Sequence, residues 1–180
     1  SEAVVDRCSE CGGLMKRVGS GTQKVEQELF DLFPKAKVLR MDADTVGASR
    51  GHEALLREFE EKKIPILLGT QMVAKGLDFE NVTLVGVLDA DLSLYAQNYH
   101  AAERTYSLLA QVVGRAGRGE RPGRAVIQTY HPENEVIQAA AKQDYETFYQ
   151  NELRMRSLRR YPPFADLFTL TVSGLSLIHI

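Results

Sequence analysis

The sequence is poor in cysteine, lacks tryptophan and has no excess of basic charge. Of its 180 residues, 22 are Lys or Arg and 24 are Asp or Glu, which gives a formal net charge of −2. A polyanionic partner would therefore have to meet a local cluster of basic residues. No apolar run approaches the roughly 18 residues of a membrane span, and the first residues do not resemble a signal peptide. We therefore expect a cytoplasmic protein with no membrane partner.

The two cysteines, Cys8 and Cys11, form a Cys-x-x-Cys pair followed by two glycines. Such a knuckle is half of a tetrahedral zinc site. None of the 4 histidines has the spacing of a paired ligand, so we expect the remaining zinc ligands upstream in a longer protein. A thioredoxin-like redox pair is the alternative, although that motif follows a strand and opens a helix. Two thiols without a special role are the third interpretation.

From about residue 19, apolar runs of strand length alternate with segments of helical period, as in a succession of βαβ units with a parallel sheet. The nearly continuous apolar runs at 64–68 and 82–88 indicate strands buried on both faces. A first helix is predicted to start at Thr22 as its N-cap and to bury one face. The apolar residues on that face of the first helix are Val25, Leu29, Leu32 and Phe33. The other expected elements are strands over 37–41 and 125–129, helices over 53–62, 101–113 and 133–159, and a strand over 167–172 after a stop at 161–164.

Two arginines, Arg115 and Arg118, lie among glycines at the end of the helix predicted over 101–113. A guanidinium presents a planar fork of donors that grips phosphate oxygens, and glycine lets the backbone approach a ligand closely. The pattern Gln-x-x-Gly-Arg-x-Gly-Arg, which begins at Gln111, therefore indicates a clamp for a triphosphate supplied from elsewhere. A solvated basic loop that complements the helix dipole is the alternative.

Two further segments offer groups suited to phosphate. Thr70, Gly76 and Asp78 follow the strand predicted over 64–68, and ligands bind beyond the carboxyl ends of parallel strands. The Thr70 hydroxyl and amide suit a phosphate, while Asp78 could accept from a ribose hydroxyl or orient an arginine; a polar connector is the alternative. Gly21 and Thr22 lie in a glycine-rich turn at a helix N-terminus, which binds anions in some proteins and only caps the helix in others.

The sequence lacks the Gly-x-x-x-x-Gly-Lys-Ser/Thr phosphate loop, so we expect no primary triphosphate cradle in this chain. Asp89 and Asp91 follow a predicted strand and could be mistaken for a magnesium-binding motif. Without a phosphate loop on the same lobe, we interpret both as structural carboxylates at a strand end.

In this order, the segments resemble the second RecA-like lobe of a superfamily 2 helicase, and more narrowly that of the bacterial primosomal helicases that restart replication. The resemblance extends from about Arg7 to Gly174. It rests on the runs 8–13, 19–22, 40–45, 69–91, 102–104, 111–119, 127–129 and 161–164. Gln23 and His100 depart from the usual pattern, where Glu and Arg are expected; these changes affect details of DNA or lobe contact.

On the nucleotide side, the resemblance implies specific roles. Arg115 and Arg118 would be arginine fingers that reach the γ-phosphate of an ATP held by a separate first lobe, and Gln111 would sense the same phosphate. Gly76 and Asp78 would line the nucleotide side of the cleft. ATP and Mg²⁺ would be bound mainly by that first lobe.

On the DNA side, Thr70 with Gly21 and Thr22 would face DNA phosphates. Cys8 and Cys11 would be ligands of Zn²⁺ in the full-length protein. The implied domains are the end of a zinc-binding segment at 1–18, a helicase C-terminal RecA-like lobe at 19–160 and the start of a C-terminal domain at 161–174. Residues 175–180 fit no element and are interpreted as an appended tail.

The resemblance implies an α/β fold, a RecA-like parallel sheet flanked by helices, in an ATP-dependent 3′-to-5′ DNA helicase of the bacterial cytoplasm, associated with the nucleoid. The partners would be single-stranded and forked DNA, primosome proteins and single-stranded-DNA-binding protein. We expect no ATPase activity from the fragment alone. The second lobe of a RecG-like helicase and a non-catalytic DNA- or primosome-binding module are the alternatives.

Overall fold

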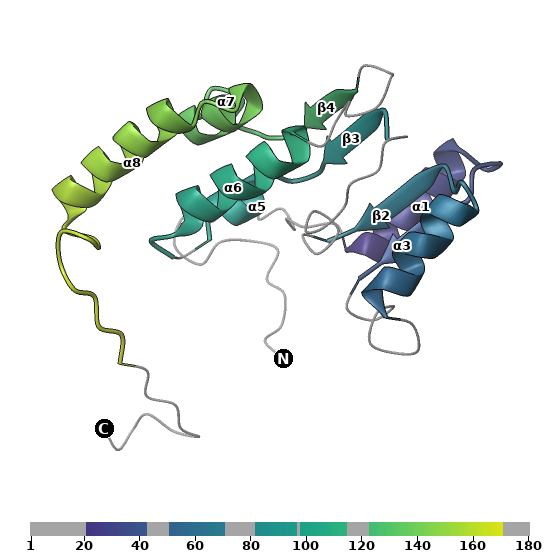
Figure 1. Ribbon diagram of the computed structural model, residues 1–180, viewed down its shortest axis with the longest axis horizontal. Coiled ribbons are helices and arrows are strands. Elements are labelled where there is room, and N and C mark those ends of the chain that lie inside the picture. The colour runs from purple at the N-terminus through teal and green to yellow at the C-terminus, as the bar shows by residue number, and fades with distance from the viewer. Residues whose placement is uncertain (1–20, 43–50, 71–81, 97, 115–122, 171–180) are drawn as a thin grey trace, which may run out of the picture.

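The computed structural model describes residues 21–42, 51–70, 82–96, 98–114 and 123–170. Helices alternate with short strands along the chain, as the sequence predicts for an α/β fold (Figure 1). The elements in order are α1 (Thr22–Leu32), β1 (Val38–Met41), α3 (His52–Glu61), β2 (Ile66–Gly69), β3 (Leu84–Val87), α5 (Asp91–Leu94), α6 (Ala101–Val113), β4 (Arg124–Ile127), α7 (Glu135–Lys142) and α8 (Tyr145–Arg159).

The described strands form two parallel pairs. β1 pairs with β2 in a register that runs from Val38↔Ile66 to Met41↔Gly69. β3 pairs with β4 from Leu84↔Arg124 to Val87↔Ile127. Each pair is joined by a helical crossover, α3 in the first and α5 with α6 in the second, as parallel strands require. The predicted parallel α/β class is therefore confirmed.

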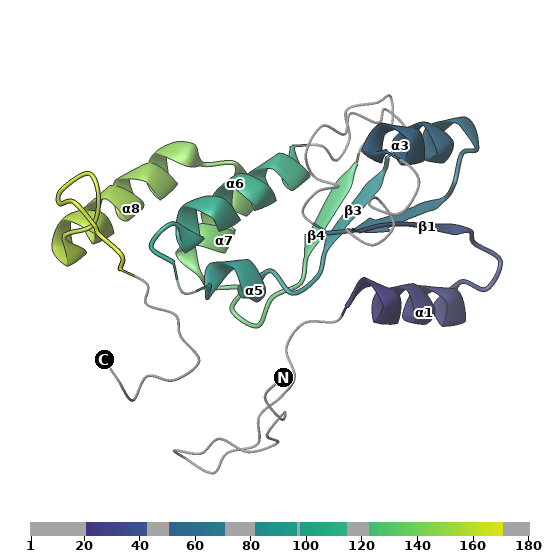
Figure 2. The ribbon, with the colours of Figure 1, turned by 90° about the horizontal axis from the view of Figure 1, so that it is seen from below.

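The first strand pair is covered by a helix on each face (Figure 2). Val25 of α1, Met41 of β1 and Leu55 of α3 are buried there. Leu32 and Phe33 are exposed, so the prediction that both lie on the buried face of the first helix is wrong. The reason is geometric, because α1 ends at Leu32 and, within the described segments, packs on two strands that lie about 5 Å apart.

The second strand pair packs against α6 and leads into the main apolar core. Leu109 of α6 and Ala140 of α7 are both 0% exposed, and the Tyr106 ring stacks on Phe148 of α8 with centroids 4.2 Å apart. Burial of such large apolar surfaces is the dominant favourable term in folding. The core therefore fixes α6, α7 and α8 relative to one another.

The strand predicted over 82–88 is not buried on both faces. Leu84 is 61% exposed, and exposure alternates along β3. Within the described residues, β3 pairs only with β4, and α6 packs against both strands. Among the described elements, α6 covers one face of this pair and the residues on the other face are exposed, which gives the alternation of a half-buried strand.

The single helix predicted over 133–159 is two helices. Gln143 adopts a left-handed conformation (φ 55°, ψ 30°) that ends α7. Asp144 then caps α8, with its Oδ1 accepting from the Thr147 backbone amide at 3.0 Å. An aspartate that bonds a nearby amide stabilises a helix start at the expense of a continuous helix. The prediction missed this break because neither residue is a glycine or a proline.

The last helix stops where the sequence predicts. α8 ends at Arg159, and Arg160 takes a left-handed conformation before the run from Tyr161 to Phe164. The strand predicted over 167–172 does not form in its described part, 167–170, where Phe168 and Leu170 are exposed. Among the helices of the described segments, none is long and apolar enough to cross a bilayer.

Candidate functional site

Three residues predicted to face an anionic ligand lie at one edge of the β1–β2 pair. Gly21 and Thr22 form the start of α1, and the Thr22 hydroxyl reaches Asp42, directly after β1. Thr70 directly follows β2, and the pairing Met41↔Gly69 makes Asp42 and Thr70 the next positions in register. The structure therefore brings the predicted group to the carboxyl edge of the strands, where ligands of open α/β sheets bind.

The N-terminus of α1 is capped by backbone alone. Gly21 is the N-cap residue, has extended ψ (149°) and makes no side-chain cap bond, so the assignment of Thr22 as N-cap is wrong. The physical reason is that the Thr22 Oγ1 donates instead to Asp42 Oδ2 at 2.7 Å. The first amides of a helix have no intrahelical acceptor and carry the positive end of its dipole. At this edge, they are the donors that suit an anion.

A chain of charges anchors α1 to the end of β1. Arg40 donates through Nη1 to Glu26 Oε2 at 2.9 Å, and its Nε lies 3.0 Å from Asp42 Oδ2. Asp42 is 6% exposed, so its carboxylate needs these partners. Glu26, Arg40, Asp42 and Thr22 thus form one network, the α1–β1 anchor, which fixes the helix start at the sheet edge.

Gln111 lies on α6, the helix that packs against the second strand pair. It lies in the last turn of α6, whose observed bounds, Ala101–Val113, coincide with the predicted helix. Val112 beside it is buried, and α6 packs on β3 and β4. Gln111 and the edge residues Gly21, Thr22 and Thr70 therefore come from different strand pairs.

Six predicted site residues lie outside the described segments. They are Cys8, Cys11, Gly76, Asp78, Arg115 and Arg118. The described residues contain no group of three or more His, Cys, Asp or Glu side chains able to hold a metal ion. The proposed zinc, nucleotide and finger roles of these six residues remain predictions.

Asp91 has the structural role that the sequence indicated. Its Oδ1 accepts from Thr129 Oγ1 at 3.0 Å and its Oδ2 accepts from the Tyr130 amide at 2.9 Å. Both oxygens of this buried carboxylate are thereby occupied at the end of β4. Asp89 sits at the preceding bend with φ 51°, which aspartate tolerates better than most residues.

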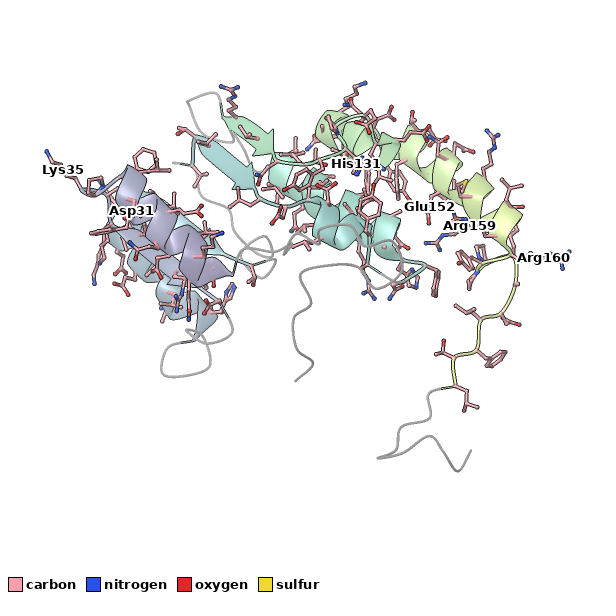
Figure 3. All side chains as sticks on the ribbon, turned by 180° about the vertical axis from the view of Figure 1, so that it is seen from behind. Asp31, Lys35, His131, Glu152, Arg159 and Arg160 are labelled. Atoms are coloured by element: carbon pink, nitrogen blue, oxygen red, sulfur yellow. The ribbon has the colours of Figure 1, made fainter. Side chains whose placement is uncertain are left out.

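The sequence did not predict the role of Arg156. The Arg156 side chain, which projects from α8, is only 13% exposed. Its guanidinium donates to Glu152 Oε1 at 2.8 Å and to Glu103 Oε2 at 2.9 Å, and lies 5.6 Å from the centre of the Tyr99 ring. Glu152 and Arg159 project from the same side of α8, whereas Arg160 points away from that side (Figure 3). The four-residue spacing between Glu152 and Arg156 was the sequence feature that could have indicated their ion pair.

The electrostatics of this contact are set by hydrogen bonds. The His100 ring, 3.0 Å from Glu103 Oε2, and then Arg156 hold the pKa of Glu103 below its ordinary value despite partial desolvation. Although desolvation opposes it, bonding to Glu152 and Glu103 raises the pKa of Arg156. Both groups are therefore charged over the physiological range, and they join α8 to the start of α6.

Comparisons with known proteins assign the family. The helicase conserved C-terminal domain family matches residues 16–120. "Replication restart protein PriA" of Bacillus subtilis (strain 168) is 53% identical over 173 residues, covering 96% of this chain and 22% of that protein. Proteins of the same name from Chlamydia pneumoniae and Synechocystis sp. are 41% and 45% identical, each over 93% of this chain and over 23% and 20% of their own lengths. The predicted resemblance to replication-restart helicases is confirmed, and the chain spans about a fifth of these relatives.

Proposed function

Since the chain belongs to the helicase conserved C-terminal domain family, we propose that it is the second RecA-like lobe of an ATP-dependent 3′-to-5′ DNA helicase that acts at stalled forks in replication restart. The observation that carries the proposal is the similarity of nearly the whole chain to replication restart proteins, at 53% identity in one case. The phosphate-gripping pattern at 111–118 supports it.

The mechanism depends on closure of two lobes around ATP. Arg115 and Arg118 stabilise the charge that develops on the transferred phosphoryl group, and Gln111 senses the γ-phosphate. An arginine finger is worth roughly 10³ to 10⁵ in the rate of phosphoryl transfer. Gly76 and Asp78 line the nucleotide side of the cleft. ATP and Mg²⁺ are held mainly by the first lobe, so this chain by itself should not hydrolyse ATP.

Contacts to the DNA backbone come from the carboxyl edge of β1 and β2. Because the Thr22 hydroxyl already donates to Asp42, Thr22 and Gly21 would meet a phosphate through the start of α1 and its backbone amides. Thr70 is exposed beside them and adds a hydroxyl donor. Contacts of this kind are independent of sequence and weaken with salt. Lobe closure would then move the protein along a single strand.

The other proposed features concern the full-length protein. Cys8 and Cys11 would be two of four thiolate ligands of a structural Zn²⁺. Primosome proteins, single-stranded-DNA-binding protein and forked DNA are the proposed partners, in the cytoplasm of a bacterium and near its nucleoid. Stoichiometric zinc in the full-length protein would support this assignment over a RecG-like helicase.

The decisive experiment measures DNA-stimulated ATP turnover in the full-length protein. We expect Arg115→Ala and Arg118→Ala each to reduce kcat by at least about 10³-fold, with DNA binding retained. Arg121→Ala is the matched control, since it removes an arginine from the same segment but outside the motif. Unchanged turnover in the two finger variants would instead favour a non-catalytic binding module.

A further inference from the structure

A side chain from a distant junction holds the last turn of α6. Gln143, between α7 and α8, donates through Nε2 to the Ala110 carbonyl at 3.3 Å. The same oxygen accepts from the Gly114 amide at 2.9 Å. Because the Ala110 carbonyl shares its peptide unit with the Gln111 amide, this bond grips the backbone at the first residue of the phosphate-gripping pattern.

Gly114 makes this approach possible. A Cβ at position 114 would lie 2.7 Å from Gln143 Nε2 and 3.2 Å from the Ala110 carbonyl oxygen. The backbone of Gly114 is ordinary right-handed helix, with φ −67° and ψ −11°, so its conformation does not require glycine. A side chain at position 114 would instead have to displace the Gln143 amide from the place that it occupies.

The residue type at position 143 also indicates that the side-chain contact with α6 matters. Its φ of 55° is the left-handed conformation that usually selects glycine or asparagine after a helix. The backbone N–H of Gln143 donates to the Ala140 carbonyl at 3.1 Å, which holds this conformation. Ala140 is fully buried. A residue with a Cβ costs free energy in this conformation, and from it the Gln143 side chain reaches α6.

We propose that Gln143 is a positioning residue for ATP hydrolysis, because it contacts the end of α6 that carries Gln111 and that the two arginines follow in the sequence. The inference rests on the proposed function. The buried faces of α6 and α7 hold the body of the helix, whereas a helix C-terminus has unbonded carbonyls and frays. The side-chain amide of Gln143 adds a second donor to the Ala110 carbonyl, which already accepts from the Gly114 backbone amide.

The test uses the full-length protein and Gln143→Asn, which keeps an amide and suits the left-handed conformation but is one methylene too short. We expect kcat for DNA-stimulated ATP hydrolysis to fall about three- to tenfold, as for loss of one orienting hydrogen bond. The KM for ATP should stay within about twofold, since the fingers act on the transition state. The midpoint of thermal unfolding should not fall. Gln143→Gly, which relieves the backbone, should behave in the same way.

Gln138→Ala is the matched control, because Gln138 also lies on α7 but its Nε2 donates to the Pro132 carbonyl at 2.6 Å. Gly114→Ala should displace the Gln143 amide and lower kcat. Combined with Gln143→Asn, it should cost no more than the larger single loss, because both changes remove one contact. Additive losses, or an unchanged kcat for Gln143→Asn, would overturn the inference. The proposed function would still stand if Arg115→Ala abolished turnover, so the two failures are distinguishable.

Discussion

The Thr22 hydroxyl donates to Asp42 Oδ2 at 2.7 Å, which ties the first residue of α1 to the residue that follows β1. The sequence separation is 20 residues, so the bond closes the α1–β1 unit at the edge proposed to meet DNA. Thr22 thus acts through tertiary structure rather than as a local cap.

Loss of the α1–β1 anchor should lower stability. We expect Asp42→Ala to reduce the free energy of unfolding by about 1–3 kcal/mol, because it removes the carboxylate that pairs with the mostly buried Arg40 guanidinium and accepts from the Thr22 hydroxyl. Thr22→Val should cost about 1 kcal/mol, and Thr22→Ser should be close to neutral. Urea denaturation of each variant and of the double variant measures the coupling. Strictly additive effects of Asp42→Ala and Thr22→Val would contradict a shared bond.

The Glu103–Arg156 contact should make stability sensitive to acid. Since the pKa of Glu103 is lowered on folding from its ordinary 4.5, the folded protein binds this proton more weakly than the unfolded chain. The contribution is present above pH 4.5 and is lost as the pH falls below it. Because the Glu103 side chain is 51% exposed, we expect less than about 1 kcal/mol.

Thermal unfolding of Glu103→Gln between pH 6 and pH 3 tests this effect. The variant should lose less stability than the parent over the interval, while Glu28→Gln, which removes an exposed pair with Lys24, serves as the control. Parallel curves for Glu103→Gln and the parent would refute the contribution of this carboxylate.

Truncation of the core residue Leu109 should strongly lower the stability of the protein. Leu109→Ala is expected to cost about 2–5 kcal/mol, since the side chain is fully buried between α6 and its neighbours. Leu158→Ala removes the same atoms from a site that is 71% exposed, and should change stability by less than about 0.5 kcal/mol. Chemical denaturation of both compares them directly. Similar losses at the two sites would argue against the described packing.

The start of α7 depends on Asn134. Its side chain accepts from the Val136 amide at 2.9 Å, so Asn134→Ala should cost about 0.5–2 kcal/mol, whereas Asn134→Asp should retain most of the stability. Thermal denaturation with hydrogen exchange at Val136 reports both effects. Equal stability of the alanine and aspartate variants would show that the cap contributes nothing.

Strong periodic signals made much of the fold predictable. The helix at 101–113 was predicted at its observed bounds, because its apolar face repeats with helical period and glycine follows it. The parallel α/β class followed from apolar runs that alternate with helices. The break at Gln143 and Asp144 was missed because it depends on one backbone conformation and one side-chain bond, which leave no apolar pattern.

The candidate site was predictable as residue types and as an edge of the sheet. Motif order identified Gly21, Thr22, Thr70 and Gln111 as candidates, and the strand register explains why Thr70 lies beside the end of β1. The partners of these residues were not predictable. Asp42, Arg156 and Gln143 act through contacts to residues far away in sequence, and no local spacing encodes such contacts.

By itself, the sequence determined the fold class, the helicase resemblance and the residues suited to grip phosphate, because hydrophobic period, turn residues and motif chemistry are local properties of a chain. Only the tertiary structure decided which polar groups are already engaged. In it, the Thr22 hydroxyl donates to Asp42, Arg156 is buried between two carboxylates, and Gln143 contacts the end of α6. These pairings depend on how the helices pack, since packing alone sets which distant side chains come within hydrogen-bonding distance.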